Sequence, residues 1–196
     1  MKKWSEIKQA TLDKLFLTID EADDQGYLSK FRYLANECLN IVANGVKPNI
    51  KSFRFEIIPG DRPQEESQYY VGEIIKMPDD FLSFADRIIL HNNKPYDDIV
   101  YLSNNEIVMG ELGDYVVYYN ATWDIIKEED VREDNVLSTD VSILNCLPTY
   151  IASQCLSQDD VQRSAILKNE FELMLSRLDT DVMYQNNHFR SSGGWY

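Results

Sequence analysis

The spacing of apolar residues changes twice along this chain, and this change constrains the fold more than any other feature of the sequence. Near the N-terminus apolar residues recur every three or four positions, as they do on one face of a helix. Over residues 50–58 they alternate with polar residues, which is the period of a half-buried strand. Helical spacing returns after residue 140. The pattern predicts an α+β protein in which helices flank a block of strands.

Two helices are predicted before the strands. An acidic stretch at residues 20–26, which contains Gly26, ends the first helix. Six apolar residues of this helix recur at helical spacing: Trp4, Ile7, Leu12, Leu15, Phe16 and Ile19. The second is bounded by Gly45 and Lys47-Pro48 and has seven residues on one face: Tyr27, Phe31, Leu34, Ala35, Cys38, Leu39 and Val42.

Short strands with turn residues between them are expected from residue 50 to residue 126. The predicted strands cover residues 50–58, 69–76, 87–90, 95–102, 106–109, 115–120 and 122–126. The turn His91-Asn92-Asn93-Lys94 is typical of a hairpin. Strands of this length and spacing predict a small antiparallel β-sandwich or barrel-like block.

Two C-terminal helices complete the prediction, after an acidic connector at residues 127–140. The first has an apolar stripe along residues 141–156, in which Pro148 either kinks the helix or marks its first turn. Ser157 and Asp160 have the spacing of a capping box for the second, which carries Ala165, Phe171, Met174, Leu175 and Leu178. Residues 1–49 and 138–180 are therefore expected to form one helical domain, with residues 50–127 as an inserted β domain and 181–196 as a C-terminal tail.

The formal net charge of −14 argues against wrapping of nucleic acid, which requires clustered Lys and Arg. An acidic surface can still stand beside DNA, because it repels the phosphates and keeps DNA from adhering. The N-terminal residues lead into an amphipathic pattern and not into an apolar signal segment. No run approaches the roughly 18–20 apolar residues of a membrane helix. The sequence predicts a soluble protein made in the cytoplasm, without a membrane partner.

Motifs for catalysis, metals and cofactors are missing from the sequence. The two histidines, His91 and His188, lie in a predicted turn and in the predicted tail. A calcium loop beginning at Glu21 would require a glutamate where Arg32 stands. Cys38, Cys146 and Cys155 have no metal or redox spacing and fall in apolar helical patterns, so we expect small core residues in a reducing compartment. We predict that the protein is not an enzyme and that it has no cofactor or metal.

Two groups of side chains leave more than one interpretation open. The carboxylate pairs Asp79-Asp80, Asp97-Asp98 and Asp159-Asp160 could serve acid–base chemistry, but adjacent acids at turns are more often capping groups. The strand block is rich in aromatic residues, which favour strand core or a subunit interface and leave carbohydrate binding as an alternative: Tyr69, Tyr70, Tyr96, Tyr101, Tyr115, Tyr118, Tyr119 and Trp123.

The C-terminal tail is polar and ends in two large aromatic residues. A disordered tail is one interpretation of this pattern. A tether whose aromatic end is anchored on a neighbouring subunit is the other, and it makes Phe189, Trp195 and Tyr196 the candidate residues of a subunit interface.

Three stretches of the chain resemble a known family. They are the helix at 27–45 with its phrase YLANECLNIVANG running into IKSFRFEI, the phrase IIKMPDDFLSFADRIILHNNKPYDD at 74–98, and the helical hairpin LNCLPTYIASQCLSQDDVQRSAILKNEFELMLSRL at 144–178. In this order they resemble the head-to-tail adaptor family of tailed phages, including the tail tubular protein A type and its relatives in phages of Gram-positive bacteria.

The resemblance implies a structural virion protein in the phage neck, made in the host cytoplasm. Members of such a family form a ring of about twelve copies by head-to-tail contacts between identical subunits. The implied partners are a second copy of the chain, the portal protein, and a tail or tail-completion protein, and DNA passes through the ring without specific binding. A tail terminator, a head-completion protein, and a carbohydrate- or protein-binding β module are the alternatives.

Overall fold

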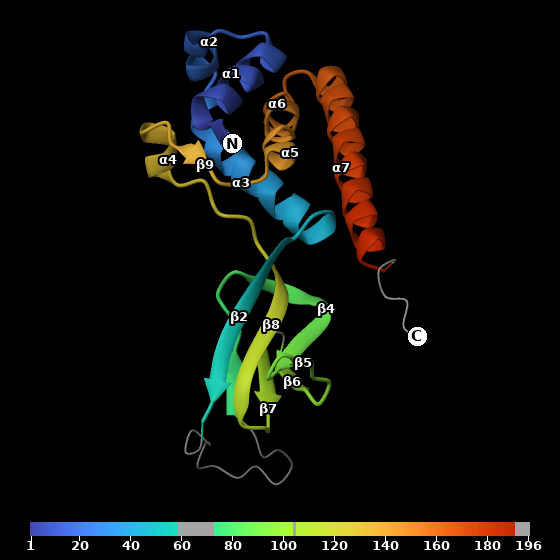
Figure 1. Cartoon of the computed structure of the whole chain (residues 1–196). Coiled ribbons are helices and arrows are strands. Elements are labelled where there is room, and N and C mark those ends of the chain that lie inside the picture. The colour runs from blue at the N-terminus through green and yellow to red at the C-terminus, as the bar shows by residue number, and fades with distance from the viewer. Residues whose placement is uncertain (59–72, 104, 191–196) are drawn as a thin grey trace. The chain divides into compact units, whose positions relative to one another are not determined.

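The computed structural model describes residues 1–58, 73–103 and 105–190, and it divides the chain into two compact units (Figure 1). The helical unit comprises Met1–Lys47 together with Trp123–Tyr196, and the β unit comprises Pro48–Thr122. Each unit has a core of its own buried apolar residues. The paired strands that the structure describes are antiparallel. The chain is therefore of mixed α and β structure, as the changes of apolar period predict.

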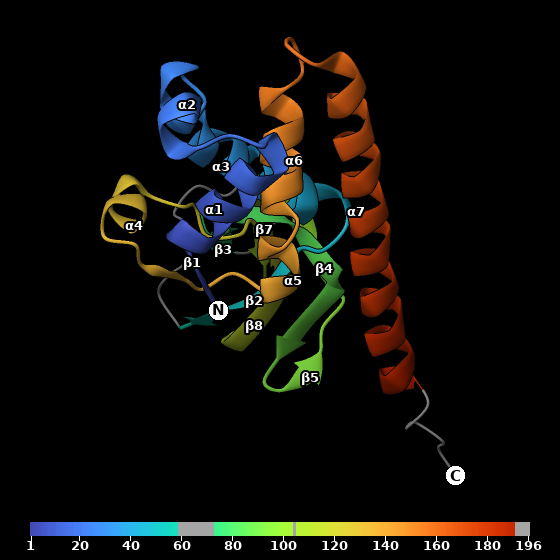
Figure 2. The ribbon, with the colours of Figure 1, turned by 90° about the horizontal axis from the view of Figure 1, so that it is seen from above.

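The helical unit is built around α6. Its elements are α1 (Trp4–Leu15), α2 (Ile19–Asp24), α3 (Leu28–Gly45), α4 (Glu128–Arg132), α5 (Val141–Leu144), α6 (Leu147–Cys155), α7 (Val161–Arg190) and the two-stranded ladder of β1 (Lys2–Lys3) with β9 (Val136–Leu137). Helix α6 contacts α1, α3 and α7, and residues 147–153 within it are all buried. Figure 2 shows α7 running alongside α6, away from α4. An apolar helix of this kind is stable only when other helices cover it on every side.

Helix α3 follows the predicted pattern closely. Its buried residues recur at helical spacing and include Phe31, Ala35, Cys38 and Val42. The helix runs from Leu28 to Gly45, which confirms the expected end. Ordinary amphipathic periodicity is therefore sufficient to predict this element.

The first predicted helix is in fact two helices. Helix α1 ends at Leu15 because Phe16 adopts the left-handed conformation. Thr18 then caps α2, and its side chain and that of Glu21 form a reciprocal capping box. The expected irregular acidic stretch thus contains a short helix, and three helices precede the β unit where two were expected.

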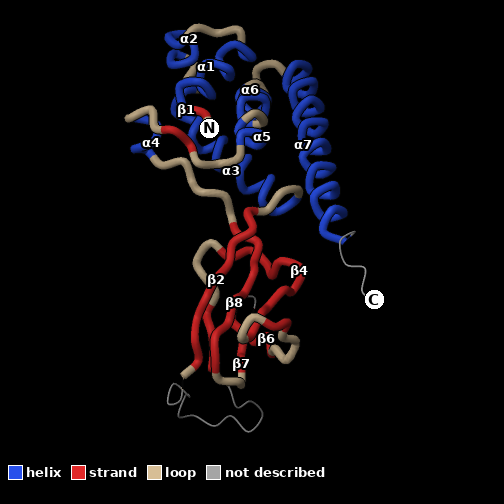
Figure 3. Tube along the Cα trace, viewed as in Figure 1, coloured by secondary structure: helices blue, strands red, loops and turns tan. Residues whose placement is uncertain are grey.

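Two antiparallel sheets enclose the core of the β unit. The strands, drawn in red in Figure 3, are β2 (Asn49–Ile57), β3 (Glu73–Lys76), β4 (Phe81–His91), β5 (Lys94–Pro95), β6 (Val100–Ser103), β7 (Glu106–Met109) and β8 (Gly113–Ala121). One sheet has the order β2-β8-β4-β5 and the other β3-β7-β6. Buried side chains of both sheets, among them Ile57, Ile107 and Val117, form a single cluster. The alternation seen in the sequence therefore places one face of each sheet in a shared core.

The predicted hairpin at residues 91–94 has a two-residue turn. Asn92 and Asn93 have φ values of 49° and 63°, and His91 pairs with Lys94. Positive φ at both central residues is the type I′ geometry that suits the twist of a hairpin, and asparagine tolerates it. The strand expected at residues 95–102 is replaced by β5 and β6 with an irregular segment between them.

The boundary after the β unit lies earlier than predicted, because residues 122–126 are not a strand. The amide of Ile126 donates to Oδ1 of Asn36 at 2.8 Å, and Nδ2 of Asn36 donates back to the Ile126 carbonyl at 3.1 Å. The Ile126 side chain is buried in the helical core. Residues 123–127 therefore belong to the helical unit, and the expected connector at 127–140 contains α4 and β9.

The C-terminal helices differ from the prediction in their caps and length. Pro148 lies in the first turn of α6, which settles the choice left open by the sequence. At α7, the amide of Arg163 donates to the Asp160 side chain at 3.0 Å, so Asp160 and not Ser157 caps this helix. Helix α7 continues to Arg190 and therefore extends into the segment 181–196 that was expected to be a tail.

Candidate functional site

The three predicted interface residues lie at the limit of the described chain. Phe189 belongs to α7, but its side chain lies outside the described part of the structure. Trp195 and Tyr196 lie outside the described residues. Their role as a subunit contact therefore stays a prediction.

Three of the predicted aromatic residues of the β unit form core and not a platform, whereas Tyr118 is half-buried. Tyr96, Tyr115 and Tyr119 are all buried. The ring of Tyr115 stacks on Phe55 with centroids 5.2 Å apart. The ring of Tyr96 packs edge-on against Tyr115, with centroids 5.5 Å apart. Rings used in this way cannot stack on a sugar. Among the remaining predicted aromatics, Tyr101 is exposed, Tyr69 and Tyr70 lie outside the described residues, and Trp123 belongs to the helical unit.

His91 lies in a structural cluster at the hairpin. Its ring stacks on Tyr115 with centroids 4.6 Å apart, and Nδ1 lies 3.2 Å from a carboxylate oxygen of Glu111. Nε2 lies 3.0 Å from the carbonyl oxygen of Leu112. Both ring nitrogens are thus engaged with the segment that precedes β8, and this arrangement fixes the turn. The other histidine, His188, is part of α7, and its side chain is outside the described structure.

The first of the predicted carboxylate pairs holds the β unit together. Oδ2 of Asp80 lies 2.8 Å from the ammonium of Lys51, and Oδ1 accepts the hydroxyl of Tyr119 at 3.0 Å. Partial burial raises the pKa of Asp80, but the hydrogen bonds from Lys51 and Tyr119 outweigh it and the pKa is lowered. Asp80 is therefore an ion-pair partner that ties the start of β4 to β2 and β8.

The pair at residues 159 and 160 serves two different helices. The hydroxyl of Tyr27 donates to Asp159, which links the start of α3 to the turn before α7. This hydrogen bond, together with partial burial, raises the pKa of Tyr27 to about 12. Because Asp160 caps α7, neither carboxylate faces the other as an acid–base pair would. Asp97 and Asp98 are exposed.

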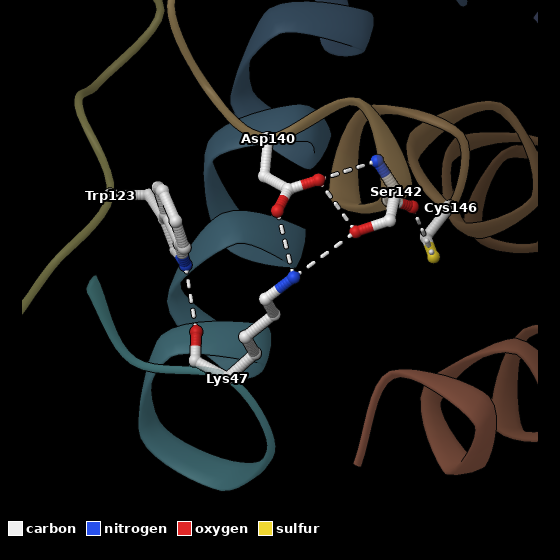
Figure 4. A network of polar contacts seen from close by, with 5 residues as sticks. All are labelled: Lys47, Trp123, Asp140, Ser142 and Cys146. Carbon is white, nitrogen blue, oxygen red and sulfur yellow. Dashed lines mark hydrogen bonds and ion pairs between the residues drawn. The ribbon is translucent and has the colours of Figure 1, made fainter. Parts of the chain in front are cut away.

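A polar cluster of the helical unit is centred on Asp140 (Figure 4). Its Oδ2 lies 2.7 Å from the ammonium of Lys47, and its Oδ1 accepts the amide and the hydroxyl of Ser142 at 2.8 and 2.7 Å. Nε1 of Trp123 donates to the carbonyl of Lys47 at 2.9 Å. The Lys47 hydrogen bond, followed by that of Ser142, lowers the pKa of Asp140 to about 2.

This cluster is a helix cap combined with an ion pair. Asp140 is the N-cap of α5, and its carboxylate takes up both donors of Ser142. Lys47 and Trp123 are the residues at which the chain leaves the helical unit and returns to it. The cluster therefore fixes those two positions of the helical unit relative to each other.

The helical unit also has a small cavity, which is lined by residues close in sequence to Trp123 and Asp140. The cavity is too small for most ligands. It has a volume of about 70 Å³, and Asp124, Asp130, Val136 and Thr139 are among its lining residues. Pockets for small molecules usually measure at least about 300 Å³. Within the described residues, no group of His, Cys, Asp and Glu side chains has a geometry suited to a metal ion. Nor does any described helix have the length and apolarity needed to cross a membrane.

The feature that sequence reasoning missed is a set of exposed apolar residues on the helical unit. Phe16 was predicted to lie on the inner face of the first helix, but 82% of its surface is exposed, and Ile19 is 45% exposed. The left-handed backbone at Phe16 turns its side chain away from the face that buries Leu12 and Leu15. Ile166 and Leu173 on α7 are also exposed. Local spacing does not distinguish Phe16 and Ile19 from core residues, whereas Ile166 and Leu173 are not among the apolar residues that the pattern assigns to the last helix.

No protein-family model matches the chain. No curated protein matches it either.

Proposed function

We propose that this protein is a structural virion protein, a head-to-tail adaptor that forms a ring between the portal and the tail of a phage and lines the DNA exit channel. The observation that carries the proposal is the exposure of large apolar side chains on the helical unit, on Phe16, Ile166 and Leu173. Exposed apolar side chains that gather on one face of a protein mark protein–protein contact. An adaptor ring requires such contacts on every subunit.

The positions of the three family-like stretches support the same proposal. The first corresponds to α3 and β2, the second to β3, β4 and β5, and the third to the end of α5 with α6 and α7. Phe31 from the first stretch and Ile151 and Phe171 from the third belong to one buried cluster. The resemblance therefore involves residues that build the cores, as it should if the fold is shared: a helical core with an inserted β-sandwich or barrel-like block.

The charge distribution is compatible with a channel subunit. Both units contain more acidic than basic residues, and the net charge of the chain is −14. An acidic wall repels DNA and allows it to slide, with the repulsion falling off over about 8 Å at physiological salt. The proposed partners are further copies of this chain, the portal protein, and a tail or tail-completion protein, and the proposed location is the virion neck. The burial of Tyr96, Tyr115 and Tyr119 makes the alternative of a carbohydrate-binding β module weaker.

The test is electron microscopy of a phage lysate. A nonsense codon is placed at Trp4 of the gene in the phage that encodes the chain, and the lysate is compared with one complemented from a plasmid. Separate heads and tails without complementation, and joined particles with it, are the expected result. Joined, infectious particles in both lysates would overturn the proposal. Joined particles lacking only an accessory fibre would favour a peripheral virion part.

A further inference from the structure

Phe16 occupies a position at which glycine is favoured. The amide of Leu17 donates to the carbonyl of Leu12 at 3.2 Å, and the amide of Phe16 donates to that of Asp13 at 3.3 Å. These bonds define a Schellman motif in which Phe16 is the left-handed residue, with φ 57° and ψ 38°. A bulky side chain is disfavoured in this conformation. The ring is also 82% exposed, so Phe16 adopts a disfavoured backbone conformation without burying its side chain in the core.

Arg163 holds the Phe16 ring in place. The guanidinium carbon lies 4.0 Å from the centre of the ring. Its two terminal nitrogens donate to the carbonyls of Lys14 and Leu15 at the end of α1, the latter at 3.3 Å. These partners carry no formal charge, so they orient the guanidinium without neutralising it. A side chain fixed before binding loses less entropy on docking, and this favours a role in recognition.

Exposed apolar residues of α7 extend this surface. Ile166 lies between Arg163 and Glu170 in the helix, and Glu170 pairs with Lys14 of α1 at 2.8 Å. Residues spaced by three and four share one side of a helix, so Ile166 lies on the same side of α7 as Arg163 and Glu170, and Leu173 follows Glu170 on that side. They are 66% and 64% exposed. We name Phe16, Arg163, Ile166 and Leu173 the Phe16 surface.

A second surface of the helical unit has apolar residues and the opposite charge. Ile125 and Val136 are 65% and 53% exposed. Both residues line the small cavity together with Asp124 and Asp130, and the Asp130 carboxylate accepts hydrogen bonds from the amide of Lys127 and from Nδ2 of Asn135. We name Asp124, Ile125, Asp130 and Val136 the α4 surface. Figures 1 and 2 both place α4 and α7 on opposite sides of the helical unit, with α1, α3 and α6 between them.

We propose that the Phe16 surface of one copy docks on the α4 surface of the next copy of this chain. Phe16, Ile166 and Leu173 would cover Ile125 and Val136, and Arg163 would face the carboxylates of Asp124 and Asp130. Charge complementarity within a strongly acidic chain is the reason for choosing a second copy, because Arg163 is the cation of the Phe16 surface and Asp124 and Asp130 are the anions of the α4 surface. Two different surfaces on opposite sides make a heterologous contact, which propagates from subunit to subunit. This inference deepens the proposed adaptor ring and rests on it.

The experiment uses the full-length protein with one substitution in each surface. Phe16→Gly removes the ring and suits the left-handed backbone, and Ile125→Asp adds a charge at an exposed position. Tyr33→Ala alters a residue that is 65% exposed and belongs to neither surface, so it is the matched control. Masses are measured by analytical ultracentrifugation over a concentration series, and circular dichroism checks the fold. Ile125→Asn is a second variant in case Ile125→Asp does not fold.

The wild type and the Tyr33→Ala variant are expected to assemble beyond dimers. Each surface variant should self-associate at least about 30-fold more weakly, as for an interface hot spot. A 1:1 mixture of Phe16→Gly and Ile125→Asp protein retains one intact pair of surfaces, so it should form heterodimers and nothing larger. A monomeric wild type, variants that assemble normally, or a mixture without heterodimers would each overturn the inference.

These outcomes are separate from the microscopy test of function. If the gene is required for joining heads to tails but both surface variants assemble normally, the adaptor role stands and the surfaces are wrong. If the surfaces mediate assembly but particles without the gene are joined, the contact stands and the adaptor role is wrong.

Discussion

The ammonium nitrogen of Lys47 lies 2.7 Å from Oδ2 of Asp140, although 93 positions separate the two residues. Lys47 is the last residue of the helical unit before the β unit, and Asp140 caps α5. The ion pair therefore links a residue of the N-terminal segment to the C-terminal helices. It stabilises the helical unit at the place where the chain is interrupted by 75 residues of insertion.

The pH dependence of unfolding should reflect Asp140. Its folded pKa is about 2 against an ordinary value of 3.8, so its contribution to stability is complete above pH 3.8 and is lost as the pH falls towards and through 2. Asp140→Asn keeps a capping side chain but cannot ionise. Urea midpoints of the wild type should fall more steeply between pH 5 and 2 than those of the variant. Parallel curves would contradict this assignment, and the comparison removes the contribution of Asp80, whose pKa is also lowered.

Gly113 and Gly45 should respond oppositely to alanine. A Cβ on Gly113, where φ is 137°, would lie 2.7 Å from side-chain atoms of His91 and Asn92. Gly113→Ala should therefore destabilise the protein by more than about 1 kcal/mol. Gly45, at the end of α3, has nothing within 4 Å of the same position, and Gly45→Ala should be neutral or stabilise by up to about 1 kcal/mol. Urea unfolding followed by circular dichroism measures both, and equal effects would show that the Gly113 backbone is not constrained.

The backbone strain at Phe16 can be measured apart from any assembly. Phe16→Ala removes the ring but keeps a Cβ in the left-handed region, whereas Phe16→Gly removes both. The glycine variant should be more stable than the alanine variant by about 1 kcal/mol. Thermal unfolding at concentrations below self-association compares the two. An alanine variant as stable as the glycine variant would show that α1 does not end in this conformation.

The three cysteines should be unreactive in the native protein. Cys38, Cys146 and Cys155 are free and buried. Burial raises the pKa of all three thiols, to about 11 for Cys146 and Cys155, so little thiolate forms at pH 8. A thiol reagent such as Ellman's should label none of them within minutes, and all of them in urea. Rapid labelling of the native protein would indicate that α6 opens easily.

Much of the fold is predictable where local and tertiary preferences agree. Helix α3 has a long amphipathic pattern that ends in glycine, and β2 alternates strictly, so their types and limits follow from periodicity. The turn at Asn92-Asn93 is also local, because asparagine accepts positive φ. The burial of the three cysteines follows from their place in apolar helical patterns.

The candidate contact surfaces could not be predicted in the same way. Phe16 continues the apolar spacing of α1, and only its left-handed backbone removes it from the core. Ile126 is a β-branched residue of the kind common in strands. Its hydrogen bonds with Asn36, 90 positions away, nevertheless place it in the helical unit. Burial of a given apolar residue depends on which distant segment reaches it, and that information is absent from local spacing.

By itself, then, the sequence determined the order of elements: helices, strands and helices, with an acidic composition and small buried cysteines. These properties follow from periodicity, turn chemistry and charge, which act over a few residues. Only the tertiary structure decided that Arg163 meets Phe16, that Lys47 meets Asp140, and that α4 and α7 lie on opposite sides of the helical unit. Those contacts form only when the chain folds into its two cores. Each contact joins residues that are much farther apart in sequence than the few residues over which a local pattern acts.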